Sequence, residues 1–211
     1  MLPEKLAGFK WQLLTMTTFV FDIDKTVAAA GYLANKSGRR ISVIDLLKMM
    51  YDAERTALLG WHRPITGDSF ASLPKGIILS RTYNLIKGEV LNTNSDMAKW
   101  SQYFSPRDNN EITLVSEPDY DFLSQREKEA LDKAFNEITE LLRRHGRGNI
   151  AHVLHKLWPE WKDPEKTCGK KSMPLELKEI LSQFIEDDEE IDRVALEIQS
   201  VQSAKAALQT N

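Results

Sequence analysis

The sequence predicts a mainly α-helical fold, in which a compact helical domain carries one small β-hairpin or short sheet and is followed by a helical C-terminal extension. Apolar residues recur at three- and four-residue intervals in several segments, as the buried face of a helix requires. Strand-like runs are confined to residues 69–73 and 111–115. A chain of 211 residues with this pattern can form a core without disulfides.

The first segments are expected to be helical. Leu2, Leu6, Phe9 and Leu13 lie on one face of a short amphipathic segment, which we expect to pack on the body of the protein. Asp24 is then expected to cap a helix that ends around residues 35–38.

Residues 41–88 form the most informative block of the sequence. Ser42 and Asp45 have the spacing of a capping box, so a helix is expected to begin near residue 43, and Gly60 is expected to end it. The turn that follows contains Pro64, which removes an amide donor, and a Thr-Gly-Asp run that favours a tight bend. A second helix is predicted over residues 77–87, with Gly88 as its stop.

The rest of the chain is also predicted to be helical. Ser124 and Glu127 have a second capping-box spacing, which begins a helix that runs to Gly146. Asn149 is expected to open a short helix that extends toward residue 155. After Pro174 the apolar spacing predicts one or two further helices, interrupted near residues 186–190.

Composition argues against several classes of protein. Cys168 is the single cysteine, so neither a disulfide framework nor a cysteine-based zinc site can form within one chain, and a reducing, cytoplasmic setting is expected. The apolar runs are far shorter than the ~20 residues that span a membrane. The net charge of −3 gives no general attraction for a polyanion. The basic cluster at residues 143–147 ends a predicted helix, where cations interact favourably with the helix dipole. Together these observations mean that neither a membrane nor a nucleic acid is expected as a partner.

One motif favours a different function. Residues 19–27 resemble the first motif of haloacid-dehalogenase-type phosphatases, in which two carboxylates, here Asp22 and Asp24, hold magnesium and the first attacks the phosphoryl group. That family requires a doubly wound parallel sheet, whereas this sequence offers only two strand-like runs. The pattern therefore favours both carboxylates as helix caps. His152 and His155 stand three residues apart without a matching Glu or Cys, so no metal site and no cofactor are predicted.

The central block resembles the Panacea domain of SocA-like antitoxins. The resemblance lies in residues 46–51, 53–55, 60–70 and 83–88 together with Leu73, Pro74 and Gly76, and weaker similarity follows at residues 119–124, Glu127, His155 and Trp161. It spans roughly residues 21–162, which divides the chain into an N-terminal extension over 1–20, a Panacea-like domain over 21–162, and a linker with a helical C-terminal extension over 163–211.

The resemblance implies an antitoxin that neutralises a cognate protein toxin by direct binding, with the toxin encoded by an adjacent gene, and no enzymatic activity. A proteolytic adapter that delivers the toxin to a protease is the alternative among binding proteins, and a homo-oligomer stays open. Because the apolar helix faces are needed for the core, charged and aromatic motif positions are left for partner binding. They are Trp61, Arg63, Asp68, Lys75 and Arg81. The remaining motif positions are expected to be structural, and they are Pro64, Thr66, Gly67, Phe70, Pro74 and Gly76.

Overall fold

The computed structural model describes residues 19–89 and 94–209, and it confirms a mainly α-helical fold with small antiparallel sheets. Its longer helices are α2 (Ile23–Lys36), α3 (Val43–Trp61), α6 (Gln125–His145) and α10 (Asp188–Gln209). The shorter helices are α4 (Ser80–Lys87), α5 (Asn94–Tyr103), η1 (Tyr120–Phe122), α7 (Ile150–Leu157), α8 (Pro164–Cys168) and α9 (Leu177–Leu181). The strands are β1 (Arg40–Ser42), β2 (Phe70–Leu73), β3 (Gly76–Leu79), β4 (Glu111–Thr113) and β5 (Met173–Leu175).

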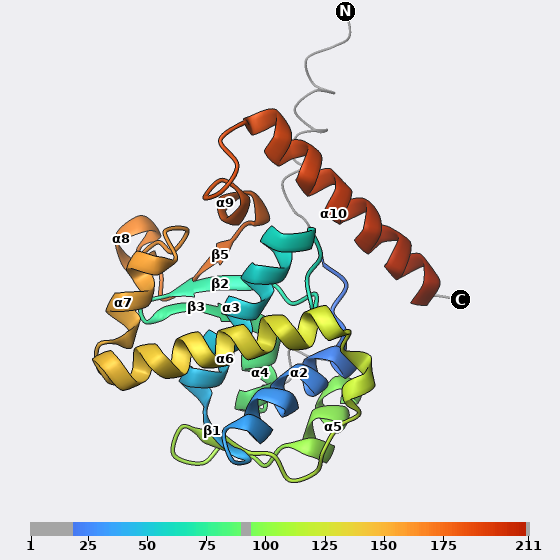
Figure 1. Cartoon of the computed structure of the whole chain (residues 1–211), viewed down its shortest axis with the longest axis vertical. Coiled ribbons are helices and arrows are strands. Elements are labelled where there is room, and N and C mark those ends of the chain that lie inside the picture. The colour runs from blue at the N-terminus through green and yellow to red at the C-terminus, as the bar shows by residue number, and fades with distance from the viewer. Residues whose placement is uncertain (1–18, 90–93, 210–211) are drawn as a thin grey trace, which may run out of the picture.

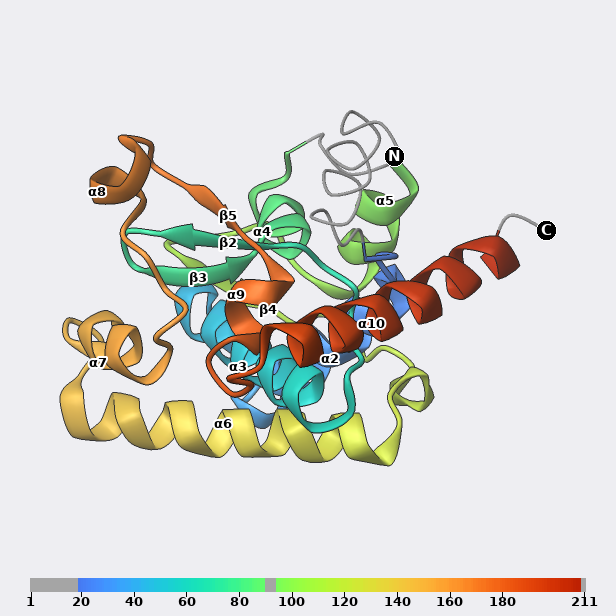
Figure 2. The ribbon, with the colours of Figure 1, turned by 90° about the horizontal axis from the view of Figure 1, so that it is seen from above.

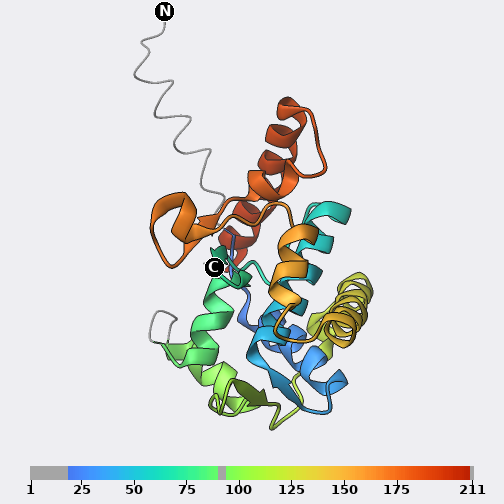
Figure 3. The same cartoon turned by 90° about the vertical axis from the view of Figure 1, so that its left-hand side faces the viewer.

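Helix α3 lies at the centre of the molecule. It packs against α6 on one side and against β3 on the other, so two layers cover it (Figure 1; Figure 2). Three charged side chains of α3 are therefore buried although they lie off its main apolar stripe: Lys48, Asp52 and Glu54 are 3%, 9% and 1% exposed. Helix α2 packs between α5 and α6, which lie on different sides of it (Figure 3).

The described residues form two small sheets. Strands β1 and β4 pair antiparallel, and the second sheet has the order β3-β2-β5, also antiparallel. The predicted strands at residues 69–73 and 111–115 correspond to β2 and β4. The predicted helix over residues 77–87 is wrong in its first turn, because residues 77–79 pair with β2 and the helix α4 begins only at Ser80. Aliphatic residues such as Ile77 and Ile78 suit a strand at least as well as a helix.

Several helix ends differ from their predictions. Of the two carboxylates predicted as caps, Asp22 caps α2 and accepts a hydrogen bond from the Lys25 N–H at 3.0 Å, whereas Asp24 lies in the first turn of the helix. The capping box predicted at the start of α3 is wrong. Ser42 is the N-cap residue but its side chain makes no capping bond, and the Asp45 carboxylate pairs with Arg147 at 2.8 Å.

Helix α3 also ends later than predicted. Gly60 continues the helix, and the left-handed residue is His62, with a φ of 55°. Three other signals are confirmed. The Ser124–Glu127 capping box is present, Gly146 follows α6, and Gly88 ends α4 with a φ of 72°.

The C-terminal segment packs on the rest of the protein. Its helices α9 and α10 are separated at residues 182–187, close to the predicted interruption, and β5 precedes them as a strand that the sequence did not predict. Leu175, Leu177, Ile180 and Ile198 belong to the same core as α2 and α3. The amphipathic segment predicted at residues 2–13 lies outside the described residues. Among the described helices, none combines the length and apolar character needed to cross a bilayer.

Candidate partner-binding site

The turn between α3 and β2 is held by a buried carboxylate. Glu54 of α3 accepts hydrogen bonds from the backbone N–H groups of Ile65 and Thr66, each at 2.7 Å, and from the Thr66 hydroxyl. Burial raises the pKa of Glu54 to about 7, although these hydrogen bonds oppose the shift. The carboxylate therefore satisfies backbone groups that would otherwise be buried without a partner. Thr66, Gly67 and Phe70 are buried as well.

Asp68 connects the same turn to helix α4. Its carboxylate accepts hydrogen bonds from the N–H groups of Arg81 and Thr82 at 2.8 Å and from the Thr82 hydroxyl at 2.7 Å. These amides lie in the first turn of α4, where no local side chain caps the helix. Asp68 is 0% exposed, so the prediction that its charge is available at the surface is wrong. A carboxylate that has three donors in the core is removed from water, and it cannot reach a partner.

Gly67 allows the turn to approach the chain before α2. Its φ is +66°, and a Cβ atom built at this position would lie 2.1 Å from the Val20 carbonyl oxygen. The neighbouring Thr66 carbonyl accepts a hydrogen bond from Asp22 N–H at 2.8 Å. The turn therefore fixes the segment that leads into α2, and only glycine fits at this contact.

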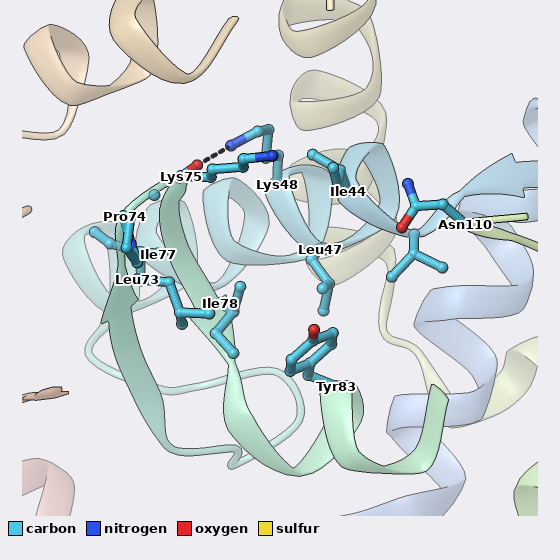
Figure 4. Close-up of a pocket in the computed structure, with 12 residues that line it drawn as sticks. Ile44, Leu47, Lys48, Leu73, Pro74, Lys75, Ile77, Ile78, Tyr83 and Asn110 are labelled. Atoms are coloured by element: carbon cyan, nitrogen blue, oxygen red, sulfur yellow. Dashed lines mark hydrogen bonds between the residues drawn. The ribbon is translucent and has the colours of Figure 1, made fainter. Parts of the chain in front are cut away.

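An apolar groove of about 330 Å³ lies between the start of α3, strand β3 and helix α4 (Figure 4). Leu47 and Tyr83 point into it from α3 and α4, and Ile78 points into it from β3. Ile44, at its rim, is 37% exposed. The remaining lining residues are Val43, Lys48, Leu73, Pro74, Lys75, Gly76, Ile77 and Asn110.

Lys48 is the buried cation of this groove. Its Nζ donates a hydrogen bond to the Lys75 carbonyl oxygen at 2.9 Å, and burial lowers its pKa to about 8, partly offset by Asp45. A Cβ at Gly76 would lie 3.1 Å from this Nζ, so the glycine leaves space beside the ammonium group. The His155 ring stacks on Trp161 nearby, and burial followed by the charge of Lys48 lowers the pKa of His155.

Comparison with protein families connects this geometry to a known domain. A family model described as the SocA-like antitoxin, Panacea domain, matches residues 46–162, which is more than half of the chain. The chain belongs to this family. Searches of curated proteins and of solved structures gave no match. The matched Panacea residues include α3 from residue 46 onward, the Glu54–Asp68 network and the whole of β2 and β3.

The residues predicted to bind a partner do not form one site in this Panacea protein. Trp61 and Arg63 line a cavity of about 640 Å³ with residues of α10, whereas Lys75 lines the apolar groove, and the two cavities share no residue. Arg63 and Lys75 are exposed, and Trp61 is half-buried with the Arg126 guanidinium 5.4 Å from its ring. Arg81 is half-buried, and its guanidinium lies 4.2 Å from the Phe21 ring.

Asp22 and Asp24 lie at the start of α2 rather than at the end of a strand. The Asp22 carboxylate pairs with Lys205 at 2.7 Å, and Asp24 pairs with Lys99 at 2.7 Å. The described residues contain only antiparallel sheets of two or three strands, and they contain no cluster of three or more His, Cys, Asp or Glu side chains suited to a metal ion. In the described Panacea fold, each carboxylate thus faces a lysine.

Sequence reasoning missed Glu160. This side chain is 1% exposed, and it accepts hydrogen bonds from the Tyr51 hydroxyl and from Arg55 Nε, each at 2.7 Å. It joins α3 to the end of the matched Panacea region. Glu160 stands between Trp158 and Trp161, but a glutamate is almost never fully buried unless it is paired, and its partners on α3 lie far away in the sequence.

Proposed function

We propose that this protein is an antitoxin that neutralises a cognate protein toxin by direct contact and without catalysis. The observation that carries the proposal is the match to the SocA-like Panacea domain over residues 46–162. The toxin is expected to be encoded by an adjacent gene, and both proteins are expected to act in the cytoplasm.

The burial of motif residues supports a division between folding and recognition. The Glu54 carboxylate accepts from the Thr66 N–H, and the Asp68 carboxylate accepts from the Thr82 N–H, so both buried acids of the motif are used within the fold. Arg63 and Lys75 are exposed motif charges, and they are our first candidates for toxin contact. Trp61 and Arg81 are half-buried and are placed second.

Co-expression with the product of the adjacent gene tests the proposal. The antitoxin is expected to restore growth that the toxin alone suppresses, and the two proteins are expected to co-purify. Rescue without a stable complex, accompanied by loss of the toxin only in hosts with an active protease, would favour the adapter function instead. Absence of both rescue and binding would overturn the proposal.

Charge reversal then locates the contact. Arg63→Glu and Lys75→Glu are expected to weaken toxin binding by a few kcal/mol where the contact is buried and hydrogen-bonded, and by less than ~1 kcal/mol where it lies on an exposed rim. Lys133→Glu is the matched control, since Lys133 is exposed on α6 and lines neither cavity. Affinity by titration calorimetry distinguishes these outcomes.

A further inference from the structure

A cavity of about 640 Å³ lies between the matched Panacea region and helix α10. Trp61 and Arg63 line it from the matched region, and Val201 lines it from α10. Helix α10 runs past the end of α3 and the start of α2 (Figure 2), where its Lys205 pairs with Asp22 at 2.7 Å. One wall of the cavity is therefore formed by a helix outside the family match.

The charged groups of this cavity are unequally satisfied. Four cations and three carboxylates line it, and four of these seven groups form two ion pairs with one another. The pairs are Lys25–Glu127 at 2.5 Å and Lys205–Asp22 at 2.7 Å. Arg63 and Arg126 are exposed, and neither forms an ion pair with any other residue of 19–89 and 94–209. Since Asp121 is the remaining acid, the cavity offers two arginines against one carboxylate.

Two aromatic side chains line the cavity beside the arginines. Phe122 is 45% exposed, and Trp61 is half-buried with the Arg126 guanidinium 5.4 Å from its ring. A contact with the ring leaves most of the five N–H donors of the guanidinium available. Aromatic residues and arginine are enriched where proteins bind one another, and Trp and Arg are frequent among the residues that carry the affinity. The cavity thus has the composition of a protein-binding site.

The volume and the charges indicate the occupant. A cavity of this size accommodates a few side chains of a partner. A nucleic acid would bring a negative charge on every phosphate, and the carboxylates of Asp22, Asp121 and Glu127 line the same cavity. A protein segment can place single carboxylates at the two arginines and an apolar side chain against Phe122. The charges therefore favour an acidic segment of a protein.

We infer that the toxin inserts an acidic segment into this cavity, with Asp or Glu side chains that bind Arg63 and Arg126 and an apolar side chain that packs on Phe122 and Trp61. This inference rests on the proposed function and names its site and the chemistry of the partner. It separates Arg63 from Lys75, which lines the apolar groove instead.

The affinity of the purified toxin for charge-reversed variants is the first test. Arg63→Glu and Arg126→Glu should each weaken binding at least about tenfold, because a carboxylate of the toxin then meets a like charge. Position 126 lies in the first turn of α6, where a glutamate is favourable, so this variant should remain stable. Lys75→Glu and Lys133→Glu reverse exposed charges outside the cavity, and they should change the affinity less than about twofold.

Phe122→Ala tests the apolar contact. It should weaken binding about tenfold, because the toxin side chain loses the ring on which it packs. Val115→Ala is the matched control, since Val115 is 55% exposed and does not line the cavity, and it should bind as the unaltered chain does. Circular dichroism checks that both variants are folded.

A charge exchange identifies the partner residue on the toxin. Single acidic residues of the toxin are replaced by lysine, and each variant is titrated against the unaltered chain and against Arg63→Glu and Arg126→Glu. One replacement should weaken binding to the unaltered chain and restore about tenfold in affinity for a charge-reversed chain. A single-stranded oligonucleotide should not compete with the toxin.

The outcomes separate this inference from the proposed function. A toxin that is neutralised by the unaltered chain, but is bound equally well by Arg63→Glu, Arg126→Glu and Phe122→Ala, would overturn the inference and leave the function in place. Absence of any charge exchange would overturn the acidic contact, and competition by the oligonucleotide would assign the arginines to a nucleic acid. Failure of the unaltered chain to bind the toxin would overturn both the inference and the function.

Discussion

Asp68 and Thr82 are joined by two hydrogen bonds through one oxygen atom: Asp68 Oδ2 accepts from the Thr82 N–H at 2.8 Å and from its hydroxyl at 2.7 Å. A residue of the turn before β2 thus caps the helix that follows β3. The β2–β3 hairpin lies between them, so the cap fixes the hairpin at both of its ends. This relationship explains why a charged residue of the motif is in the core.

The first prediction concerns this cap. Asp68→Ala should lower the free energy of unfolding by about 2–4 kcal/mol, because two buried amides and a hydroxyl lose their acceptor. Urea unfolding followed by circular dichroism measures the change. Ser69→Ala is the control, since Ser69 is exposed and uses its backbone carbonyl for the bond to Ser80. Equal stability of the two variants would show that water replaces the carboxylate.

The second prediction concerns Gly67. Gly67→Ala should lower the free energy of unfolding by about 3 kcal/mol, because a Cβ atom both strains a φ of +66° and collides with the Val20 carbonyl oxygen. Gly88→Ala separates these effects. Gly88 has a φ of +72° but no neighbouring atom within 4 Å, so its substitution should cost about 1 kcal/mol. Similar losses in both variants would mean that the Val20 contact relaxes without strain.

The elements that were predicted correctly depend on local signals. The Ser124–Glu127 capping box and the glycine stop at residue 88 involve residues that are close in the chain, and both are present. The position of Asp68 could not be predicted in this way, because its partners belong to a helix beyond the hairpin. Strand β5 was missed for a related reason, since a short run with Pro174 becomes a strand only by pairing with β2.

The candidate site was predicted less well than the fold. Periodicity located the apolar face of α3, but it gave no indication that Lys48 would be buried beside the β2–β3 hairpin or Glu54 beneath the turn before β2. Exposed positions such as Arg63 and Lys75 were identified as charged motif residues, yet the sequence could not show that they border different cavities. Surface geometry depends on contacts between distant segments, and these are set by tertiary packing.

The third prediction concerns the pH dependence of stability. The pKa of Lys48 is about 8 in the folded chain, whereas the ordinary pKa of a lysine is 10.5. Between pH 8 and pH 10.5 the folded chain has therefore released a proton that the unfolded chain retains. Raising the pH from 8 to 10.5 should therefore stabilise the protein relative to Lys48→Met, by up to about 3 kcal/mol. Below pH 8 the difference should be constant. If the free energies of unfolding of the unaltered chain and of Lys48→Met change in parallel between pH 8 and pH 10.5, the lowered pKa of Lys48 is contradicted.

The fourth prediction is the absence of phosphatase activity. Asp22 is occupied as the cap of α2 and as the partner of Lys205, so magnesium-dependent turnover of a generic phosphomonoester is not expected. Asp22→Asn keeps a good N-cap residue and loses one ion pair, which should change stability by less than ~1 kcal/mol. Turnover by the unaltered protein that disappears in Asp22→Asn, but not in a control such as Asp121→Asn, would restore the phosphatase hypothesis.

The last prediction concerns the C-terminal segment. A chain that ends at residue 187 loses α10. In this helix Gln202 accepts a hydrogen bond from Val20 N–H at 3.0 Å, and Ile198 is buried. The shortened chain should therefore fold with a lower melting temperature. A chain that ends at residue 172 also loses β5 and α9, leaving β2 unpaired on one side and the core open at Leu177, so cooperative unfolding should be lost. Only the longer chain can therefore report on recognition. Toxin rescue by this chain would place the contact outside α10, whereas a folded chain without rescue would assign the contact to α10.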